Sequence, residues 1–173
     1  MSLVFSAIVP HPPILITTIG KENLKQLKVT ADAYLKLEQD LYASQPETMV
    51  IISPHGPSQE KAFSLNLNPE FYGDFKDFGD LTTKFSLKGD VGLTHKIREK
   101  METLAPLQLT SVARLDHGAA IPLYLLTQHL PKIKIIPFYY SGLDLTAHYN
   151  IGQMIKNELL SSETRIACLA SGD

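Results

Sequence analysis

The sequence is poor in cysteine and contains no tryptophan. Its 173 residues include a single cysteine, Cys168. One thiol excludes a disulfide within the chain and any zinc module built from several cysteines. The chain also lacks a basic excess, because 16 Lys and Arg residues stand against 18 Asp and Glu residues. A general nucleic-acid-binding surface needs such an excess to displace counterions, so we expect no nucleic-acid partner.

Long apolar runs are absent as well. No run approaches the roughly 20 residues that span a bilayer, so we expect no membrane partner. Residues 1–9 are apolar, but no basic region precedes them and His-Pro-Pro follows at once, which argues against a signal peptide. A cytoplasmic location is therefore the expectation, and the single thiol agrees with a reducing compartment.

The composition is that of an ordinary globular domain. Hydrophobic residues make up 44% of the chain and charged residues 20%. A chain of this length buries roughly 70% of its unfolded surface, so it needs neither a disulfide nor a metal merely to fold. We expect one domain over residues 1–173.

Short apolar segments alternate with amphipathic segments along the chain. Residues 68–80 are expected to form a long aromatic and acidic loop, because Gly73 and Gly79 interrupt them. The alternation predicts an α/β fold of three layers, in which helices flank a central, mostly parallel sheet. The predicted strands are residues 3–9, 49–52, 63–67 (half-exposed), 107–112, 133–138 and 165–170, and the predicted helices are residues 23–41, 91–103, 119–130 and 147–160.

The last predicted strand has no helix after it. Residues 166–170 have the apolar character of a central strand, which normally leads into a covering helix. We therefore expect an incomplete domain, or a last segment that pairs with something outside the chain. A homo-oligomer or a companion domain is the expected protein partner.

Three of the six histidines lie at the ends of predicted elements, beside proline or glycine. His11 follows the first predicted strand, His55 follows the second, and His117 precedes an apolar helix. The carboxyl ends of parallel strands meet at one edge of a sheet, where ligands bind, so we expect His11 and His55 to be neighbours. The flanking prolines restrict the backbone, and Gly56 and Gly118 allow a ligand to approach closely.

Imidazoles clustered in this way are typical of a metal site. Iron, zinc, copper and nickel all bind imidazole, and two histidines with one carboxylate form the triad of non-haem Fe(II) oxygenases. The nearest carboxylates by position are Asp116 and Asp173, and neither is a clear partner. A zinc hydrolase would use the same histidines with water in the open position. The other three histidines, His95, His129 and His148, are expected to be solvated or structural.

Four short motifs occur in order along the chain. They are AIVPHPP at residues 7–13, IISPHG at 51–56, LDHGAAIPL at 115–123 and ASGD at 170–173. Together they resemble the class III extradiol ring-cleavage dioxygenase family of the LigB type, in which the last motif precedes a catalytic Leu-Ser-His segment. The sequence is also similar to the Memo-like branch, the AmmeMemoRadiSam proteins, which share the fold.

The resemblance implies a role for each histidine. His11 and His55 would bind a metal, Fe(II) or alternatively Zn. His117 would be catalytic from outside the ligand set, with a hydrogen bond to the substrate or to oxygen. The reaction implied is extradiol-type cleavage of a small, catechol-like aromatic substrate by O2. The predicted substrate-binding residues are Asp116, Gly56 and Gly118.

The family also requires groups that this sequence does not contain. An acid/base histidine and a glutamate ligand are expected beyond Asp173, so we expect the chain to be inactive by itself. A Memo-like alternative is a metal-binding accessory protein that partners a radical enzyme or a companion domain, without ring cleavage. We also expect the rings of residues 71–78 to pack on the core rather than cover a substrate, and Cys168 to be buried and unreactive.

Overall fold

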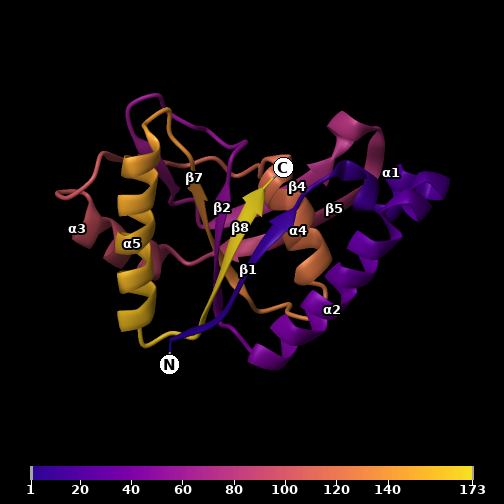
Figure 1. The fold of residues 1–173 in the computed structure, drawn as a ribbon, viewed down its shortest axis with the longest axis horizontal. Helices are drawn as coiled ribbons and strands as arrows, with labels where there is room; N and C mark the ends of the chain where they lie inside the picture. The colour runs from indigo at the N-terminus through magenta and orange to yellow at the C-terminus, as the bar shows by residue number, and fades with distance from the viewer. Residues whose placement is uncertain (1, 173) are drawn as a thin grey trace.

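The computed structural model describes residues 2–172. Strands and helices alternate through most of the chain (Figure 1). The elements are β1 (Leu3–Pro10), α1 (Thr17–Gly20), α2 (Lys28–Ser44), β2 (Thr48–Ser53), β3 (Phe63–Asn66), β4 (Glu70–Phe75), β5 (Asp80–Gly89), α3 (Val91–Met101), β6 (Leu107–Thr110), α4 (His117–Leu126), β7 (Lys134–Tyr139), α5 (Leu145–Ser161) and β8 (Ile166–Gly172), with short 3-10 helices at Pro13–Leu15, Lys21–Leu27 and Lys76–Phe78.

The strands form one mixed sheet in which parallel pairing prevails. Its main path runs β1-β8-β2-β7-β3-β6, and β5 pairs with both β4 and the start of β7. The β1–β8, β8–β2, β2–β7, β3–β6 and β5–β7 pairs are parallel, whereas β3–β7 and β4–β5 are antiparallel. The last strand, β8, lies inside the sheet, which confirms the prediction of a central strand from its apolar sequence.

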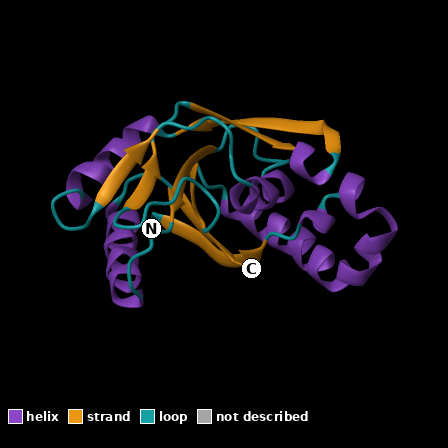
Figure 2. Cartoon of the chain, turned by 90° about the horizontal axis from the view of Figure 1, so that it is seen from above, coloured by secondary structure: helices purple, strands orange, loops and turns teal. Residues whose placement is uncertain are grey.

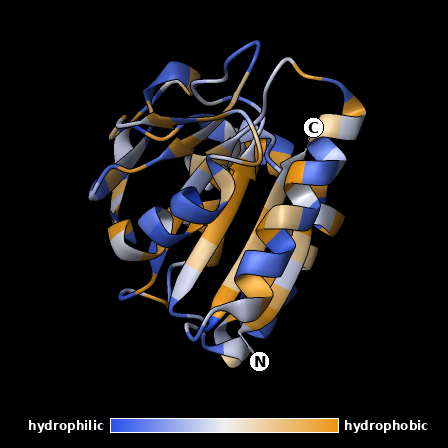
Figure 3. Cartoon of the chain, turned by 90° about the vertical axis from the view of Figure 1, so that its left-hand side faces the viewer, coloured by the Kyte–Doolittle hydropathy of each residue, from blue (hydrophilic) through white to orange (hydrophobic). Residues whose placement is uncertain are grey.

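Helices cover both faces of the sheet, so the predicted three-layer α/β fold is confirmed (Figure 2). Successive side chains of a strand point to opposite faces. In β2, Met49 and Ile51 pack in the cluster that holds the buried residues of α2 and α4. Val50 packs in the other cluster, with the apolar residues of α3 and α5. The apolar strands therefore form the middle layer, between helices that carry both polar and apolar residues (Figure 3).

Cys168 lies in β8, between β1 and β2, and is half-buried rather than buried as predicted. Burial raises the pKa of its thiol to about 11. The thiol is therefore mostly protonated at neutral pH and a poor nucleophile, as predicted.

Within residues 2–172, no helix has both the length and the apolar character needed to cross a membrane.

The prediction that residues 68–80 form a long loop is wrong. Most of this segment belongs to a hairpin formed by β4 and β5, and β5 continues to Gly89. Gly73 does not interrupt the strand, because the Phe85 ring on the opposite strand packs directly over it. A Cβ atom on Gly73 would lie 2.2 Å from that ring. The glycine thus makes room for an aromatic neighbour.

Several predicted element boundaries also need correction. The helix predicted at residues 23–41 is a 3-10 segment followed by α2, and its apolar residue Leu35 is 65% exposed. The helix predicted at residues 119–130 is α4, which starts at His117 and ends at Leu126. The strand β3, predicted to be half-exposed, is fully buried between β7 and β6, and the buried side chain of Asn66 bonds to both backbone groups of Val112.

Candidate metal centre

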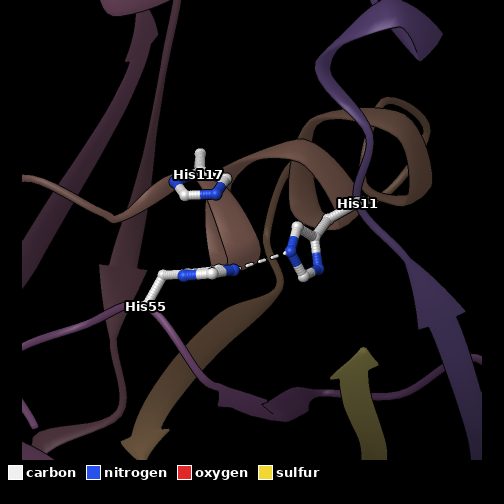
Figure 4. A group of neighbouring side chains, drawn as sticks. All are labelled: His11, His55 and His117. Atoms are coloured by element: carbon white, nitrogen blue, oxygen red, sulfur yellow. Dashed lines mark hydrogen bonds between the residues drawn. The ribbon is translucent and has the colours of Figure 1, made fainter. Parts of the chain in front are cut away.

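His11 and His55 meet at the carboxyl edge of the sheet (Figure 4). His11 follows the end of β1 directly, and His55 lies two residues beyond the end of β2. These strands run parallel with β8 between them, so their carboxyl ends lie at the same edge. The Nε2 atoms of the two imidazoles are 3.0 Å apart. The rings are nearly perpendicular, with an interplanar angle of 83°.

His117 joins the same cluster from the first turn of α4. Its ring stacks on the His55 ring with centroids 4.2 Å apart, and its centroid lies 5.4 Å from that of His11. One nitrogen from each of the three rings lies within 4.8 Å of the others. His11 is buried, His117 is half-buried and His55 is exposed, so the cluster is accessible from the side of His55.

Asp116 caps α4 and ties it to β2. Its Oδ1 accepts hydrogen bonds from the backbone N–H of Ala119, at 3.1 Å, and from the Ser53 hydroxyl. The same Ser53 hydroxyl accepts a bond from the backbone N–H of His55, at 3.3 Å. These bonds fix the helix end that carries His117 relative to the strand end that precedes His55. The Asp116 Oδ2 atom is buried without a hydrogen-bond partner in the described part of the chain.

The two predicted substrate-binding glycines both lie in tight packing. A Cβ atom on Gly118 would lie 2.6 Å from Ser53 Oγ and 3.1 Å from His55 Cδ2. A Cβ atom on Gly56 would lie 2.0 Å from the ring of Tyr139, a fully buried residue. The absence of a side chain at these positions lets the elements around the cluster approach one another. A role for Gly56, Gly118 and Asp116 in binding a substrate stays a prediction.

The β4–β5 hairpin places one aromatic ring beside the cluster. The ring of Phe78, 37% exposed, contacts the His117 ring edge-on with centroids 5.5 Å apart. Phe71 and Phe75 are fully buried, so the prediction of core packing is confirmed for these two rings. The same prediction was wrong for Phe78, which is partly exposed beside His117, because its position depends on a hairpin that was predicted as a loop.

Ion pairs hold the tip of this hairpin in place. The Arg114 guanidinium donates to Asp74 at 2.7 Å and to Asp77 at 2.6 Å. Burial raises the pKa of Asp74, but the hydrogen bond and the charge of Arg114 outweigh this effect and lower it. Asp74 therefore stays ionised at neutral pH and holds the hairpin to the segment that leads into α4.

The donor set fits a divalent transition metal. Two nitrogens that bind one ion at right angles, with bonds of about 2.1 Å, lie about 3 Å apart. The Nε2 atoms of His11 and His55 have this spacing, at 3.0 Å. Imidazole suits iron, zinc, copper and nickel, and does not discriminate sharply among them. Of the predicted carboxylate candidates, Asp116 serves as a helix cap and is not part of the histidine cluster, and Asp173 lies outside the described residues.

Fold and site together define an α/β protein with a histidine cluster of metal-binding type at the carboxyl edge of its sheet. The chain belongs to the family described as the catalytic LigB subunit of aromatic ring-opening dioxygenase, whose family model matches residues 6–173. The resemblance inferred from the four motifs is therefore confirmed, and with it the assignment to a dioxygenase family.

Two further comparisons agree with this membership. The chain is 28% identical to protein CA_C1420 of Clostridium acetobutylicum. The match covers the whole of this chain and 39% of that protein. The crystal structure of the uncharacterized protein JW3007 from Escherichia coli K12 shares the fold, with a TM-score of 0.60 at 17% identity, over 82% of this chain and 51% of that one. The chain thus spans about two fifths of the relative and half of the solved structure.

Proposed function

We propose that this chain provides the metal-binding part of an extradiol-type dioxygenase. His11 and His55 bind Fe(II), and the substrate is a catechol-like aromatic compound that reacts with O2. The observation that supports this proposal best is the 3.0 Å separation of the two Nε2 atoms at the ligand-binding edge of the sheet. The metal would act as a Lewis acid toward the phenol and as a template for both reactants.

The ring orientations support different roles for the three histidines. A nitrogen lone pair of imidazole lies in the plane of its ring, so the nearly perpendicular rings of His11 and His55 can point at one ion from two directions. The His117 ring is stacked on that of His55 at an interplanar angle of 26°. His117 therefore presents the face of its ring, and not a ring nitrogen, to the His55 ring. This arrangement favours His117 as a group that contacts a bound molecule.

His117 is suited to proton transfer at this position. Its backbone is fixed at the start of α4, and the ring is half-buried beside the two proposed ligands. Imidazole exchanges protons near neutral pH and donates or accepts a hydrogen bond according to its charge and tautomer. We therefore assign His117 the role of a hydrogen-bond partner and proton carrier for a hydroxyl of the substrate or for oxygen.

The test uses the natural full-length polypeptide that contains this chain. The protein is loaded with Fe(II) without air, mixed with a panel of catechols and then exposed to oxygen. We expect a coloured ring-opened product, and we expect His117→Ala to bind iron but to form much less product. Bound iron without product for any catechol would reject ring cleavage. Metal analysis of the purified protein distinguishes iron from the alternative, zinc.

A second proposal is a metal-binding accessory role of the Memo-like kind, alongside a radical enzyme or a companion domain. The observation that favours it is that the match covers only 39% of the Clostridium protein, so more than half of that protein lies outside the matched part. Under this proposal the same histidines hold the metal. The catechol assay then yields no product, and a companion segment is required for any activity.

Phe78 provides the flat apolar surface that an aromatic substrate requires. We expect Phe78→Leu to raise KM for a catechol about fivefold to tenfold, because the loss of a ring contact is worth about 1 kcal/mol. The affinity for the metal should stay the same, since the ring contacts His117 and not the proposed ligands. Steady-state kinetics and metal titration check both parts, with Tyr72→Leu, on the same hairpin and 45% exposed, as the control. An unchanged KM would remove Phe78 from the substrate site.

A further inference from the structure

We propose that Ser171 is a positioning residue that fixes the tautomer of His11. In this tautomer the hydrogen of the neutral ring is on Nδ1, and Nε2 presents its lone pair to His55 and the metal. The inference rests on the proposed metal site. It adds to that site a residue on a third strand, which neither the family match nor the histidine pattern assigns.

The position of Ser171 is set by the sheet. It lies near the end of β8, between the strand ends that lead to His11 and His55, and its register partner on β1 is Val9. The residue is 1% exposed. Its Oγ is 2.8 Å from His11 Nδ1 and donates to the backbone carbonyl of Gly118 at 2.6 Å. Both partners are therefore bound by a hydroxyl that is shielded from water.

The hydroxyl has one hydrogen, and this decides the direction of both bonds. A backbone carbonyl can only accept, so the hydrogen of Ser171 is directed to Gly118. The same oxygen must then accept from His11, which places a hydrogen on Nδ1. A neutral imidazole has one N–H, so Nε2 carries none. That bare nitrogen is the atom that lies 3.0 Å from His55 Nε2.

This arrangement is the usual way in which a protein prepares a histidine ligand. Metal-binding histidines generally donate their second ring N–H to a carboxylate, a carbonyl or a similar group, which fixes the tautomer and the ring orientation. Here the acceptor hydroxyl is itself held by Gly118, next to His117 on α4. Ser171 thus aligns the His11 ring and anchors the helix end that carries the third histidine.

The first test measures the tautomer directly in the metal-free chain. Proton–nitrogen NMR correlations of the histidine rings should show a hydrogen on Nδ1 of His11 in the wild type. In Ser171→Ala, we expect this signature to be lost in favour of a mixture or of the other tautomer. A wild-type His11 ring with its hydrogen on Nε2 would overturn the inference. This outcome is measured on the wild-type protein alone, so it does not depend on whether the variant folds.

The second test is a titration with Zn(II), which reports on the same ligands without redox chemistry. We expect Ser171→Ala to bind Zn(II) about 10–100-fold more weakly. Ser171→Thr retains the hydroxyl and should recover part of the affinity. The control is Ser64→Ala, since Ser64 is also a fully buried strand serine, and its hydroxyl has no hydrogen-bond partner in residues 2–172. This control should bind like the wild type.

The two tests separate the inference from the proposed function. A wild-type protein with the expected tautomer but no affinity for Zn(II) or Fe(II) would reject the metal site. A wild type that binds metal, together with a Ser171→Ala protein of equal affinity and unchanged tautomer, would reject the role of Ser171. An equal loss of affinity in Ser64→Ala would also contradict it, because the effect would then come from any truncated buried serine.

Discussion

Replacing His11 or His55 by alanine is expected to abolish metal binding for practical purposes. Each provides one of the two Nε2 atoms that lie 3.0 Å apart, so either change leaves one strong donor. Replacement of a group that is hydrogen-bonded to a metal ligand commonly costs about 10–100-fold in affinity, so loss of a ligand itself should exceed about 100-fold. Fe(II) and Zn(II) titrations of the purified variants give this result directly.

His117→Ala is the informative comparison in the same series. Its ring stacks on the face of the His55 ring, and His117 is not one of the two proposed ligands, so we expect a loss of less than about tenfold in metal affinity. His129→Ala is the matched histidine control and should leave the affinity unchanged, because the exposed His129 ring pairs with Glu38 on α2 and is not part of the cluster. A loss in His117→Ala as large as that in His11→Ala would show that all three histidines are ligands.

Replacing Gly56 by alanine is expected to destabilise the protein and to weaken the metal site. The added Cβ would lie 2.0 Å from two ring atoms of Tyr139, and that ring is fully buried. Either the ring or the segment that carries His55 must therefore move. Overpacking of this kind costs about 1–3 kcal/mol in the free energy of unfolding. A displaced His55 should also weaken Zn(II) binding.

Urea denaturation and metal titration measure the two effects of Gly56→Ala separately. The control is Gly152→Ala, because Gly152 is in the middle of α5 and a Cβ atom there meets nothing within 4 Å. Removing a glycine from a helix interior should stabilise the protein by about 0.5–1 kcal/mol. If Gly56→Ala unfolds at the same urea concentration as the wild type, close packing at Gly56 is not a constraint.

The sequence predicted most of the layered fold because its strands are apolar on both faces. The segments of β2, β7 and β8 are continuous apolar runs, and such runs are typical of a sheet covered on both sides. The hairpin of β4 and β5 was not predicted, because its sequence is not a continuous apolar run. Its glycines suggested turns, whereas Gly73 is in a strand because the cross-strand ring of Phe85 fills the space above it. That pairing is a non-local interaction.

The sequence by itself placed His11 and His55 at the ends of parallel strands, and hence at one edge of the sheet. Local signals were enough for this, because apolar runs mark the strands and prolines mark their ends. Only the tertiary structure decided how the rings face one another, and that Phe78 and Ser171 lie beside them. These arrangements depend on β8 lying between β1 and β2 and on the docking of α4 and the hairpin, which are set by contacts between residues far apart in the chain.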